Sequence, residues 1–415
     1  MRPHLGCMAE FQHGAGTRIL IVGGGHAGLL LALTLDHAGL PVTVIEAQPL
    51  DAILAAPFDG RALALMHGSR RVLDGLGLWP EFEGIAEPVR GVRVYDEGTD
   101  STLTYDAAEV GEPAFAYGIT NRDLRRRLLE LALARPGITL LAPARLATLE
   151  RRAEKIVATL ADGTRLAAEL VVGVDGRGSV VRELAQIGAR RWSYPQTAIT
   201  FALRLERPAE QRVHEFLRSA GPLALLPLRH NLCSVTWVET RAVADHLLAG
   251  DPATLLLELQ DRIGHELGAA ALCGQPTGHP LGGLQAARHA APRVALAGDA
   301  AHGLHPIHAQ GFNLAVRDIA ALAEVVVDSA RAGADLGNAE ALVRYDRWRR
   351  ADAQLMVGLT DGLNRLFSTN LPAAKLVRGL GLAALERLAP LKQLAMRRGM
   401  GLEGDLPKLA RGETL

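Results

Sequence analysis

A glycine-rich turn near the N-terminus constrains the fold of this chain more than any other feature. Gly23, Gly25 and Gly28 follow an apolar run, RILIVGG, that predicts a buried strand, and they open a helix expected over residues 26–38. The next apolar run, LPVTVIEA, predicts a second strand, which completes a strand–helix–strand unit. Glycines at this spacing let a pyrophosphate approach the backbone at the helix N-terminus. The sequence therefore predicts an α/β domain that binds a dinucleotide.

An acidic residue at the end of the second strand narrows the choice of nucleotide. Glu46 lies eighteen residues after Gly28, where its carboxylate can accept hydrogen bonds from an adenosine ribose. The same carboxylate would repel a 2′-phosphate, so FAD or NAD is favoured over NADP. The alternative interpretation is a glycine-rich turn in an α/β protein without a nucleotide.

A second strand–turn–helix segment lies near residue 300. Gly298 and Asp299 end the run PRVALAGDA, and an acid at this end of a strand suits the ribityl hydroxyls of a flavin. A helix is expected to follow, to about Ala332, and its first residues are Gly311, Phe312, Asn313 and Leu314. Its N-terminal dipole would stabilise negative charge on the flavin N1 and C2 carbonyl in the reduced form. A plain strand–loop–helix connection is the alternative.

A third polar segment follows another predicted strand. Asp175 begins the sequence DGRGS, and Arg182 comes three residues after it. Taken alone, this segment is a polar turn as readily as a binding element.

Composition excludes several classes of protein. Forty-five basic and forty-five acidic residues give a formal charge of zero, which argues against nucleic-acid binding. Aromatic residues make up 4% of the chain and leave little material for stacking on bases. Three separated cysteines and the lack of an apolar stretch in residues 1–16, a loose tail without a signal peptide, favour a cytoplasmic location.

The remaining hydrophobic pattern predicts the domain organisation. Helices are expected over residues 60–78, 121–135, 252–268 and most of the chain after 337, with strands within 89–106, 138–172 and 196–240. The predicted domains are a discontinuous FAD-binding domain (17–80, 110–185 and 285–335), a substrate domain (81–109 and 186–284) and a C-terminal helical region (336–415).

The three motifs together resemble those of a known family. GxGxxG, then DGxxSxxR, then GDAAHxxHPxxxQGxNxxxxD are similar to the motifs of class A flavin-dependent aromatic hydroxylases. The third motif, with RALALMHGSRRVLDGLGLW, GPLALLPL and RYDRWRRADAQLMVGLTDGLNRLF, resembles the ubiquinone-biosynthesis hydroxylases over roughly residues 17–402. The resemblance implies a Rossmann-like FAD-binding domain with an inserted, mostly antiparallel substrate domain, as in p-hydroxybenzoate hydroxylase.

The resemblance also assigns residues. FAD would be contacted by Arg61, Arg122, Asp175, Gly298, Asp299 and residues 311–314, in addition to the first glycine turn and Glu46. Pro306 would lie beside the flavin edge where oxygen adds, with His305 and Gln310 completing the catalytic set. The substrate pocket is assigned to Leu223, Leu225, Pro227 and His308.

The implied reaction is carried by the cofactor. NADH or NADPH, bound transiently, would reduce FAD; O₂ would add at flavin C4a; and the hydroperoxide would hydroxylate the ring of a (poly)prenylated phenol. The protein would have to exclude water so that the hydroperoxide does not release H₂O₂. The alternatives are a flavin hydroxylase of a small soluble aromatic, a flavin reductase of isoprenoid double bonds, and a flavin-binding scaffold of the biosynthetic complex.

Two features of the third motif need comment. Ala309 stands where the subfamily has glycine, and a positive φ there would strain alanine by about 1 kcal/mol. His302, His305 and His308 have a spacing that suggests metal ligands, but Pro306 breaks any helix through them and no metal site is expected.

The C-terminal stretch 361–402 is basic and amphipathic. Its seven basic residues are Arg365, Lys375, Arg378, Arg387, Lys392, Arg397 and Arg398, against Asp361 and Glu386. Packing against the body of the enzyme explains the pattern. The alternative is a surface for other ubiquinone-biosynthesis proteins or for peripheral contact with the inner face of the membrane, which a prenylated substrate would favour.

Overall fold

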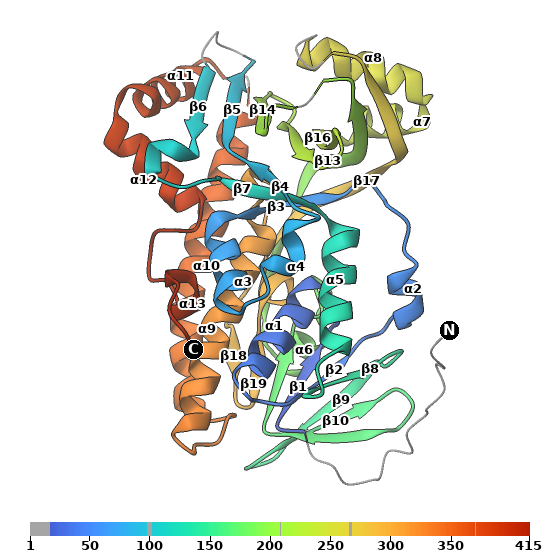
Figure 1. Cartoon of the computed structure of the whole chain (residues 1–415), viewed down its shortest axis with the longest axis vertical. Coiled ribbons are helices and arrows are strands. Elements are labelled where there is room, and N and C mark those ends of the chain that lie inside the picture. The colour runs from blue at the N-terminus through green and yellow to red at the C-terminus, as the bar shows by residue number, and fades with distance from the viewer. Residues whose placement is uncertain (1–16, 98–101, 208, 265–267, 370) are drawn as a thin grey trace.

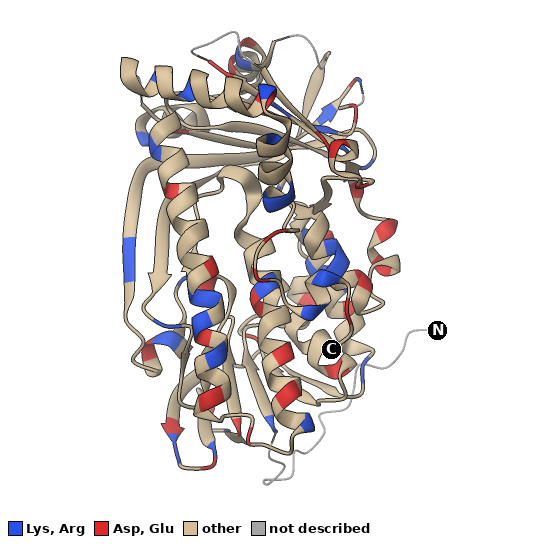
Figure 2. Ribbon diagram, turned by 90° about the vertical axis from the view of Figure 1, so that its left-hand side faces the viewer, with Lys and Arg blue, Asp and Glu red and all other residues tan. Residues whose placement is uncertain are grey.

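The structure is a computed structural model that describes residues 17–97, 102–207, 209–264, 268–369 and 371–415. The predicted N-terminal tail, residues 1–16, lies outside the described residues. A parallel sheet occupies the lower half of the molecule in Figure 1, a large antiparallel sheet the upper half, and long C-terminal helices its left side. Basic and acidic residues are interspersed over the face in Figure 2, in keeping with the zero net charge.

The lower sheet contains the predicted strand–helix–strand unit. Its strand order is β18 (Ala290–Ala291), β19 (Val294–Leu296), β12 (Leu170–Gly173), β1 (Ile19–Val22), β2 (Val42–Ile45) and β8 (Ile138–Leu141). All neighbours are parallel except β18 and β19. Helix α1 (His26–His37) connects β1 to β2, so the glycine turn lies at the carboxyl end of β1.

Both faces of this sheet are covered, which explains why its strands are continuous apolar runs. Ile19 and Ile21 point to the face packed by α1, α5 (Asn121–Leu133) and α9 (Gly311–Arg331). Leu20 and Val22 point to the opposite face. That face is covered by α6 (Val180–Leu184) and by a small sheet of β9 (Leu146–Arg151), β10 (Ile156–Leu160) and β11 (Arg165–Ala168).

The upper sheet has eight strands and is antiparallel except between β14 and β5. Its order is β20 (His302–Gly303), β17 (Ala270–Ala286), β13 (Ala189–Leu205), β16 (Leu232–Thr240), β15 (Leu223–Leu228), β14 (Arg212–Leu217), β5 (Gly91–Asp96) and β6 (Thr102–Asp106). Helices α7 (Arg241–Ala249) and α8 (Pro252–Ile263) pack on it. Both predicted substrate-domain segments contribute strands, and β20 joins from the predicted FAD-binding segment; the domain boundaries stay a prediction.

Two helix predictions need correction. Residues 60–78 were expected to be one helix, but they form β3 (Ala62–Met66) followed by α3 (His67–Gly75). Strand β3 pairs with β7 (Ala116–Thr120), which also pairs with β4 (Glu87–Val89), so distant pairing overrides the helix propensity of ALALM. The helix expected over 252–268 ends at Ile263, where Gly264 has a φ of +73°.

The C-terminal region is helical, as predicted. It comprises α10 (Ala339–Phe367), α11 (Pro372–Arg387), α12 (Ala389–Gly399) and α13 (Lys408–Arg411). The short helical turns elsewhere are α2 (Leu50–Leu54), α4 (Pro80–Glu83), η1 (Ala107–Val110), η2 (Gly298–Ala300) and η3 (Ile307–Ala309). Within the described part of the chain, no helix combines the length and the apolar character needed to cross a membrane.

Candidate active site

The first glycine turn packs against a neighbouring strand end. Gly23 has a φ of +110°, and its N–H donates to the Ile45 carbonyl at 2.9 Å. A Cβ at Gly28 would lie 1.8 Å from the Gly23 carbonyl oxygen, so no side chain fits there. A Cβ at Gly25 would meet no protein atom within 4 Å. Gly23 and Gly28 therefore serve close packing, while Gly25 leaves space in front of α1.

The N-terminus of α1 is free to bind an anion. Gly25 precedes the helix, no side chain caps it, and its first turn contains no acidic residue. Helix α9 begins in the same way, after Gln310 and without a side-chain cap or an acid in its first turn. The two starts are linked, because the rings of His26 and Phe312 meet edge-on with centroids 5.8 Å apart. Two uncapped helix starts beside each other fit the pyrophosphate and the ring end of FAD.

Glu46 is held rigidly at the end of β2. It is buried, and its two carboxylate oxygens accept the N–H groups of Gly24 at 2.7 Å and Gln48 at 2.8 Å. Arg125, from α5, lies 3.5 Å from the same carboxylate. Arg125 was not singled out from the sequence, although the arginine-rich pattern of residues 121–135 contains it.

Arg61 and Arg122 lie near the start of α1. Asn121 provides the link: its N–H donates to the Arg61 carbonyl at 3.0 Å, and its carbonyl lies 2.9 Å from His26 Nε2. Arg61 is ion-paired with Asp59, whereas Arg122 pairs with the adjacent Asp123. Burial lowers the pKa of His26 to about 4, so this half-buried imidazole is neutral at physiological pH.

The second motif supports the turn that carries Asp299. Arg182 is buried and donates to the Ala300 carbonyl at 2.7 Å and to the Arg177 carbonyl at 2.8 Å. Arg177 Nε in turn lies 3.9 Å from the Asp299 carboxylate. Asp175 accepts the N–H groups of Val180 and Val181 through one oxygen, and its other oxygen is buried without a hydrogen-bond partner among the described residues.

Asp299 itself remains accessible at the end of the third motif. Its side chain is 51% exposed, and Gly298, with a φ of +60°, places it just beyond β19. The protein packed around this carboxylate raises its pKa, an effect that Arg177 opposes. The accessible carboxylate can therefore accept hydrogen bonds from a ligand.

A buried ion-pair network fixes the Gly298–Asp299 turn from below. Asp318 is fully buried and accepts the Gly298 N–H at 2.9 Å; His302 Nε2 lies 2.6 Å and Arg349 Nε 2.7 Å from its carboxylate. Burial alone would raise the pKa of Asp318, but His302 and Arg349 outweigh it and lower the pKa. Asp318 ends the third motif, whereas its partner Arg349 lies on another helix, inside the RYDRWRRADAQ run, and was not singled out as a site residue.

The four FAD contacts predicted at the start of α9 differ in whether a ligand can reach them. The Asn313 side chain accepts from Met66 N–H and Ser69 Oγ and donates to the Ala64 and Ala309 carbonyls, all at 2.8–2.9 Å. These four bonds use its full hydrogen-bonding capacity, so its side chain holds β3 and α3 against α9. Leu314 is buried, and its N–H bonds within the helix turn. Gly311 and Phe312 are partly exposed.

The loop before α9 has an unusual backbone. His308 and Ala309 are exposed and have φ values of +65° and +50°. Ala309 therefore occupies the left-handed region in which glycine is favoured. Gln310 donates to the Gly399 carbonyl at 3.0 Å, which ties this loop to the end of α12. Pro306 is partly exposed beside them.

His305 lies beneath this loop. The imidazole is buried, accepts the Ile307 N–H through Nδ1 at 3.2 Å, and meets the Tyr194 ring edge-on at 5.1 Å. Burial lowers the pKa of His305 to about 4, so it is neutral, and its Nε2 has no hydrogen-bond partner among the described residues. The geometry places His305 as a neutral group under the loop and not as an exposed acid.

The residues predicted for the substrate wall on β15 lie on the wrong face of the strand. Leu223 and Leu225 belong to the core between β15 and the helices α7 and α8. Residues on alternate positions of a strand face opposite sides. Leu226, on the other side, packs with a cluster that includes Met66, Phe115 and Met400. Pro227 is buried and sits with its carbonyl against Gly118. A wall built on β15 would use Leu226 rather than Leu223 and Leu225.

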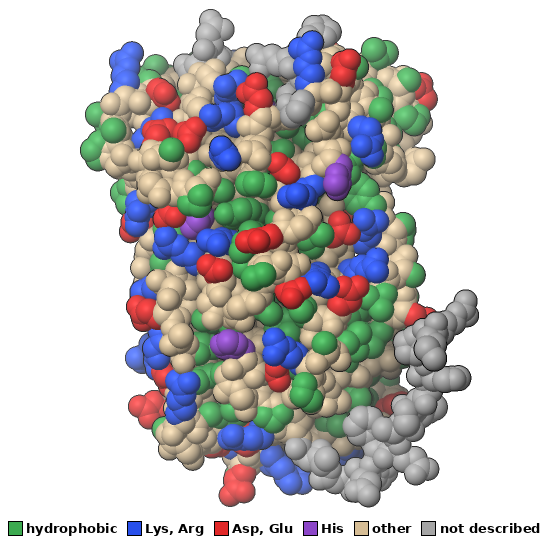
Figure 3. Space-filling view, viewed as in Figure 1, with side chains coloured by type: hydrophobic (Ala, Val, Ile, Leu, Met, Phe, Trp, Pro, Cys, Tyr) green, Lys and Arg blue, Asp and Glu red, His purple; other side chains and the backbone are tan. Residues whose placement is uncertain are grey.

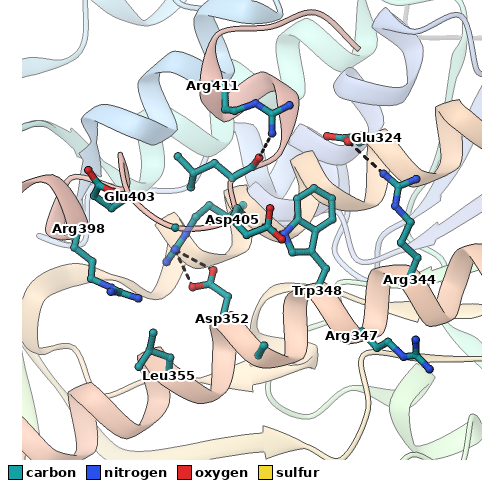
Figure 4. Close-up of a pocket in the computed structure, with 14 residues that line it drawn as sticks. Glu324, Arg344, Arg347, Trp348, Asp352, Leu355, Arg398, Glu403, Asp405 and Arg411 are labelled. Atoms are coloured by element: carbon teal, nitrogen blue, oxygen red, sulfur yellow. Dashed lines mark hydrogen bonds and ion pairs between the residues drawn. The ribbon is translucent and has the colours of Figure 1, made fainter.

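A cavity of about 730 Å³ lies elsewhere, between α9, α10 and the segment after α12 (Figure 4). Its walls are charged and contain none of the predicted cofactor, catalytic or substrate residues. Arg317 on this wall lies 2.9 Å from Asp352, which also accepts from Arg349, so the cavity touches the ion-pair network below Asp299. We assign no ligand to it.

Comparison with known proteins is consistent with this site. The family of the FAD binding domain matches residues 16–360, and the chain belongs to that family. The predicted fold class is confirmed: the p-nitrophenol 4-monooxygenase PnpA from Pseudomonas putida DLL-E4 superposes with a TM-score of 0.79, covering 94% of this chain and 99% of its own, at 19% identity.

Two curated relatives place the chain more closely. Ubiquinone hydroxylase UbiL of Rhodospirillum rubrum is 42% identical over 400 residues, which are 96% of this chain and 93% of that protein. The 3-demethoxyubiquinol 3-hydroxylase of Escherichia coli is 34% identical over 388 residues, 93% of this chain and 99% of its own. The resemblance to the ubiquinone-biosynthesis hydroxylases is thus confirmed.

Proposed function

We propose that the protein is an FAD-dependent monooxygenase that hydroxylates the aromatic ring of a (poly)prenylated phenol in ubiquinone biosynthesis, using NADH or NADPH and O₂. The observation that carries this proposal is the convergence of the three motifs on adjoining helix starts and one accessible carboxylate, Asp299. The names of the two relatives support the substrate class.

The residues that would hold FAD follow from the geometry above. The backbone at Gly23, Gly25 and Gly28 would receive the pyrophosphate, and Glu46 the adenosine ribose. Asp299 would bind the ribityl chain, and the N-terminus of α9 at Gly311 and Phe312 would face the ring end. The N–H groups there favour negative charge on the flavin.

Arg61 and Arg122 would complete the nucleotide end, while Asp175 would act through the α6 turn. Bound FAD supplies the redox chemistry: it accepts electrons from NADH or NADPH and activates O₂. The protein's part is to position the ring and to keep water away.

The apolar cluster beside the α9 start would hold the aromatic ring of the substrate. Leu226, Met66 and Phe115 pack there, and Met66 N–H bonds to Asn313 at the start of α9. Pro306 and His308 lie on the loop that leads to the same start. We propose Pro306, His305 and Gln310 as residues that shape this edge, His305 and Gln310 by fixing the loop from below.

We further propose that the enzyme works in the cytoplasm as a peripheral protein at the inner face of the membrane and meets other ubiquinone-biosynthesis proteins there. A prenyl tail keeps the substrate in lipid, which favours an enzyme that approaches the bilayer.

The test is oxygen transfer by the holoenzyme. With NADH or NADPH, ¹⁸O₂ and a short-chain prenylphenol, we expect a product one oxygen heavier that carries the label, with reductant consumption coupled to product. Reductant consumption that yields only H₂O₂ would overturn the proposal.

A substitution of Asp299 tests the assignment of the FAD site. Asp299→Ala should be isolated colourless, because the ribityl contact is lost; a charged-group hydrogen bond of about 1.5–3 kcal/mol corresponds to roughly 10- to 100-fold weaker binding. Glu183→Ala, an exposed acid on α6, is the matched control and should remain yellow. A fully yellow Asp299→Ala protein would remove Asp299 from the FAD site.

A further inference from the structure

Helices α11 and α12 expose leucine where a surface helix ordinarily exposes polar side chains. Seven of the fourteen large hydrophobic residues that are exposed among the described residues lie within residues 371–394. We call them the leucine face: Leu371, Leu376, Val377, Leu380, Leu388, Leu391 and Leu394. Figure 3 shows hydrophobic side chains at its upper left, where Figure 1 places α11. Large patches of exposed apolar surface are typical of interaction sites.

Two cations of the same helices, Arg378 and Lys392, point inward. Arg378 is buried, donates to the Phe367 and Thr369 carbonyls at 3.3 and 3.1 Å, and lies 3.4 Å from Asp96. Lys392, also buried, lies 3.0 Å from Glu109. Each helix thus buries one paired cation, and the described residues leave the leucines of both helices exposed.

The structure also reduces the basic excess seen in the sequence. Four of the seven basic residues of 361–402 are in ion pairs: Arg365, Arg378, Lys392 and Arg397. Lys375, Arg387 and Arg398 are exposed and have no ion pair within the described residues. Lys375 and Arg387 remain available beside the leucine face, whereas Arg398 lines the charged cavity of Figure 4.

The chemistry of the leucine face favours lipid over protein as its occupant. Residues 371–399 contain no aromatic residue, and their one acid, Glu386, lies 3.8 Å from Lys392. Cores of protein interfaces are enriched in aromatic residues and methionine. Exposed leucines with lysine and arginine beside them match acyl chains and anionic headgroups instead.

The leucine face and the candidate active site share a helix. Met396 on the inward side of α12, and Met400 directly after this helix, pack in the same cluster as Met66 and Phe115. The end of α12 accepts the Gln310 hydrogen bond through the Gly399 carbonyl. A bilayer against Leu391 and Leu394 would therefore lie one helix thickness away from the apolar wall of the site.

We propose that the leucine face docks α11 and α12 on a bilayer that contains anionic lipid, and that a prenylated substrate reaches the active site from that bilayer. The entry of a prenylated substrate from the bilayer rests on the proposed function, whereas the docking does not. Leu376, Val377 and Leu380 enter the acyl region, while Lys375 and Arg387 contact headgroups.

Vesicle flotation of the full-length holoenzyme tests the docking. The vesicles are phosphatidylcholine with phosphatidylglycerol at 3:1, and phosphatidylcholine alone. We expect the wild type to float with the anionic vesicles, and Leu376→Gln/Leu380→Gln to lose at least about tenfold in partition coefficient. The matched control, Leu133→Gln/Val343→Gln, removes exposed apolar residues (50% and 46%, against 64% and 62% for Leu376 and Leu380) from α5 and α10 and should float like the wild type.

Charge removal supplies an independent arm. Lys375→Gln/Arg387→Gln should weaken binding to the anionic vesicles by roughly tenfold or more, from about fivefold for each cation, and leave binding to phosphatidylcholine unchanged. Failure of the wild type to float on anionic vesicles, or equal losses in the leucine and control variants, would overturn the proposal. So would light scattering that shows a wild-type dimer dissociated by Leu376→Gln/Leu380→Gln, since a second copy would then be the occupant.

Turnover of a water-soluble, short-chain prenylphenol separates this inference from the proposed function. The leucine variant should hydroxylate that substrate at the wild-type rate, and only turnover of a long-chain substrate embedded in vesicles should fall. Flotation without any hydroxylation would refute the function and keep the docking. Hydroxylation without flotation would refute the docking and keep the proposed function.

Discussion

Helices α9 and α11 bury charge alike but treat their apolar residues in opposite ways. In α9 the apolar residues are inside, and the charged residues Arg317, Asp318 and Glu324 are buried with partners. In α11 the buried residues are Arg378 and Leu382, while Leu376 and Leu380 face outward. Protein packing alone explains α9. The outward face of α11 fits the proposed contact with lipid, because the described residues leave Leu376 and Leu380 exposed.

The largest expected effect tests the buried network of α9. Asp318→Asn removes the negative charge that neutralises Arg349 and holds His302. An uncompensated buried charge costs about 3–5 kcal/mol, so the free energy of unfolding in urea should fall by that amount and FAD should be lost. Asp328→Asn, whose partners Arg344 and Lys408 are partly exposed, should cost less than about 1 kcal/mol. Equal losses would mean that the network does not fix the site.

The next largest effect is the difference in stability cost between substitutions on the inward and the outward side of α12. Met396→Ala opens a cavity in the cluster beside the active site and should cost about 2–5 kcal/mol. Leu394→Ala, on the leucine face, should change stability in buffer by less than about 0.5 kcal/mol. Urea unfolding of both variants measures the difference. Similar costs would show that Leu394 is packed, and would break the contrast between the helices.

Acid should weaken the region around α9. Burial lowers the pKa of His289 to about 3 and of His305 to about 4, from 6.5. The pKa of His26 is likewise lowered to about 4, so between pH 6.5 and pH 4 the unfolded chain binds three protons at these histidines that the folded protein does not. Stability is therefore complete above pH 6.5 and falls on acidification, by up to about 1.4 kcal/mol per pH unit for each histidine.

Urea unfolding of the wild type and His305→Gln across this range checks the sign and size. The variant should lose about a third of the slope that these three histidines give, and His246→Gln, at an exposed position of α7, is the control. A wild-type stability that rises as the pH falls would contradict the assignment.

The smallest expected effect concerns Ala309 in the loop before α9. Ala309→Gly should raise the free energy of unfolding by about 1 kcal/mol, because the φ of +50° strains alanine. Ala351→Gly, in the regular helix α10, should lower it by a similar amount. The two variants compared by urea unfolding must therefore move in opposite directions; a loss in both would mean that Ala309 is unstrained.

Local patterns predicted part of this molecule well. The β1–α1–β2 unit and the turn at Gly298 follow from short-range features: apolar runs, glycine spacing and a strand-end acid. Strand β3 did not, because its identity depends on pairing with β7 some fifty residues away. The sequence shows that successive side chains of β15 alternate between two faces, but not which face lies toward the loop before α9. Leu225 was therefore predicted for the substrate wall, whereas Leu226 packs with the apolar cluster of Met66 and Phe115 beside that loop.

The missed parts of the site have a common physical cause. Asp318 and Arg349 meet across two helices, and Arg125 reaches Glu46 from a helix that follows several other elements. Such contacts depend on how elements pack and leave no mark on residue spacing. The basic residues of 361–402 were counted correctly, but only the packing shows that Arg378 and Lys392 point inward.

The hydrogen bond between Gln310 and the Gly399 carbonyl bears on the order of assembly. During synthesis, the glycine turn at Gly23 emerges early and can form with its own neighbours. The loop before α9 has to wait for a partner 89 residues further along the chain. Because domains form as their segments leave the ribosome, the nucleotide end of the site can form while translation continues, and the reactive end closes only when the last helices have emerged.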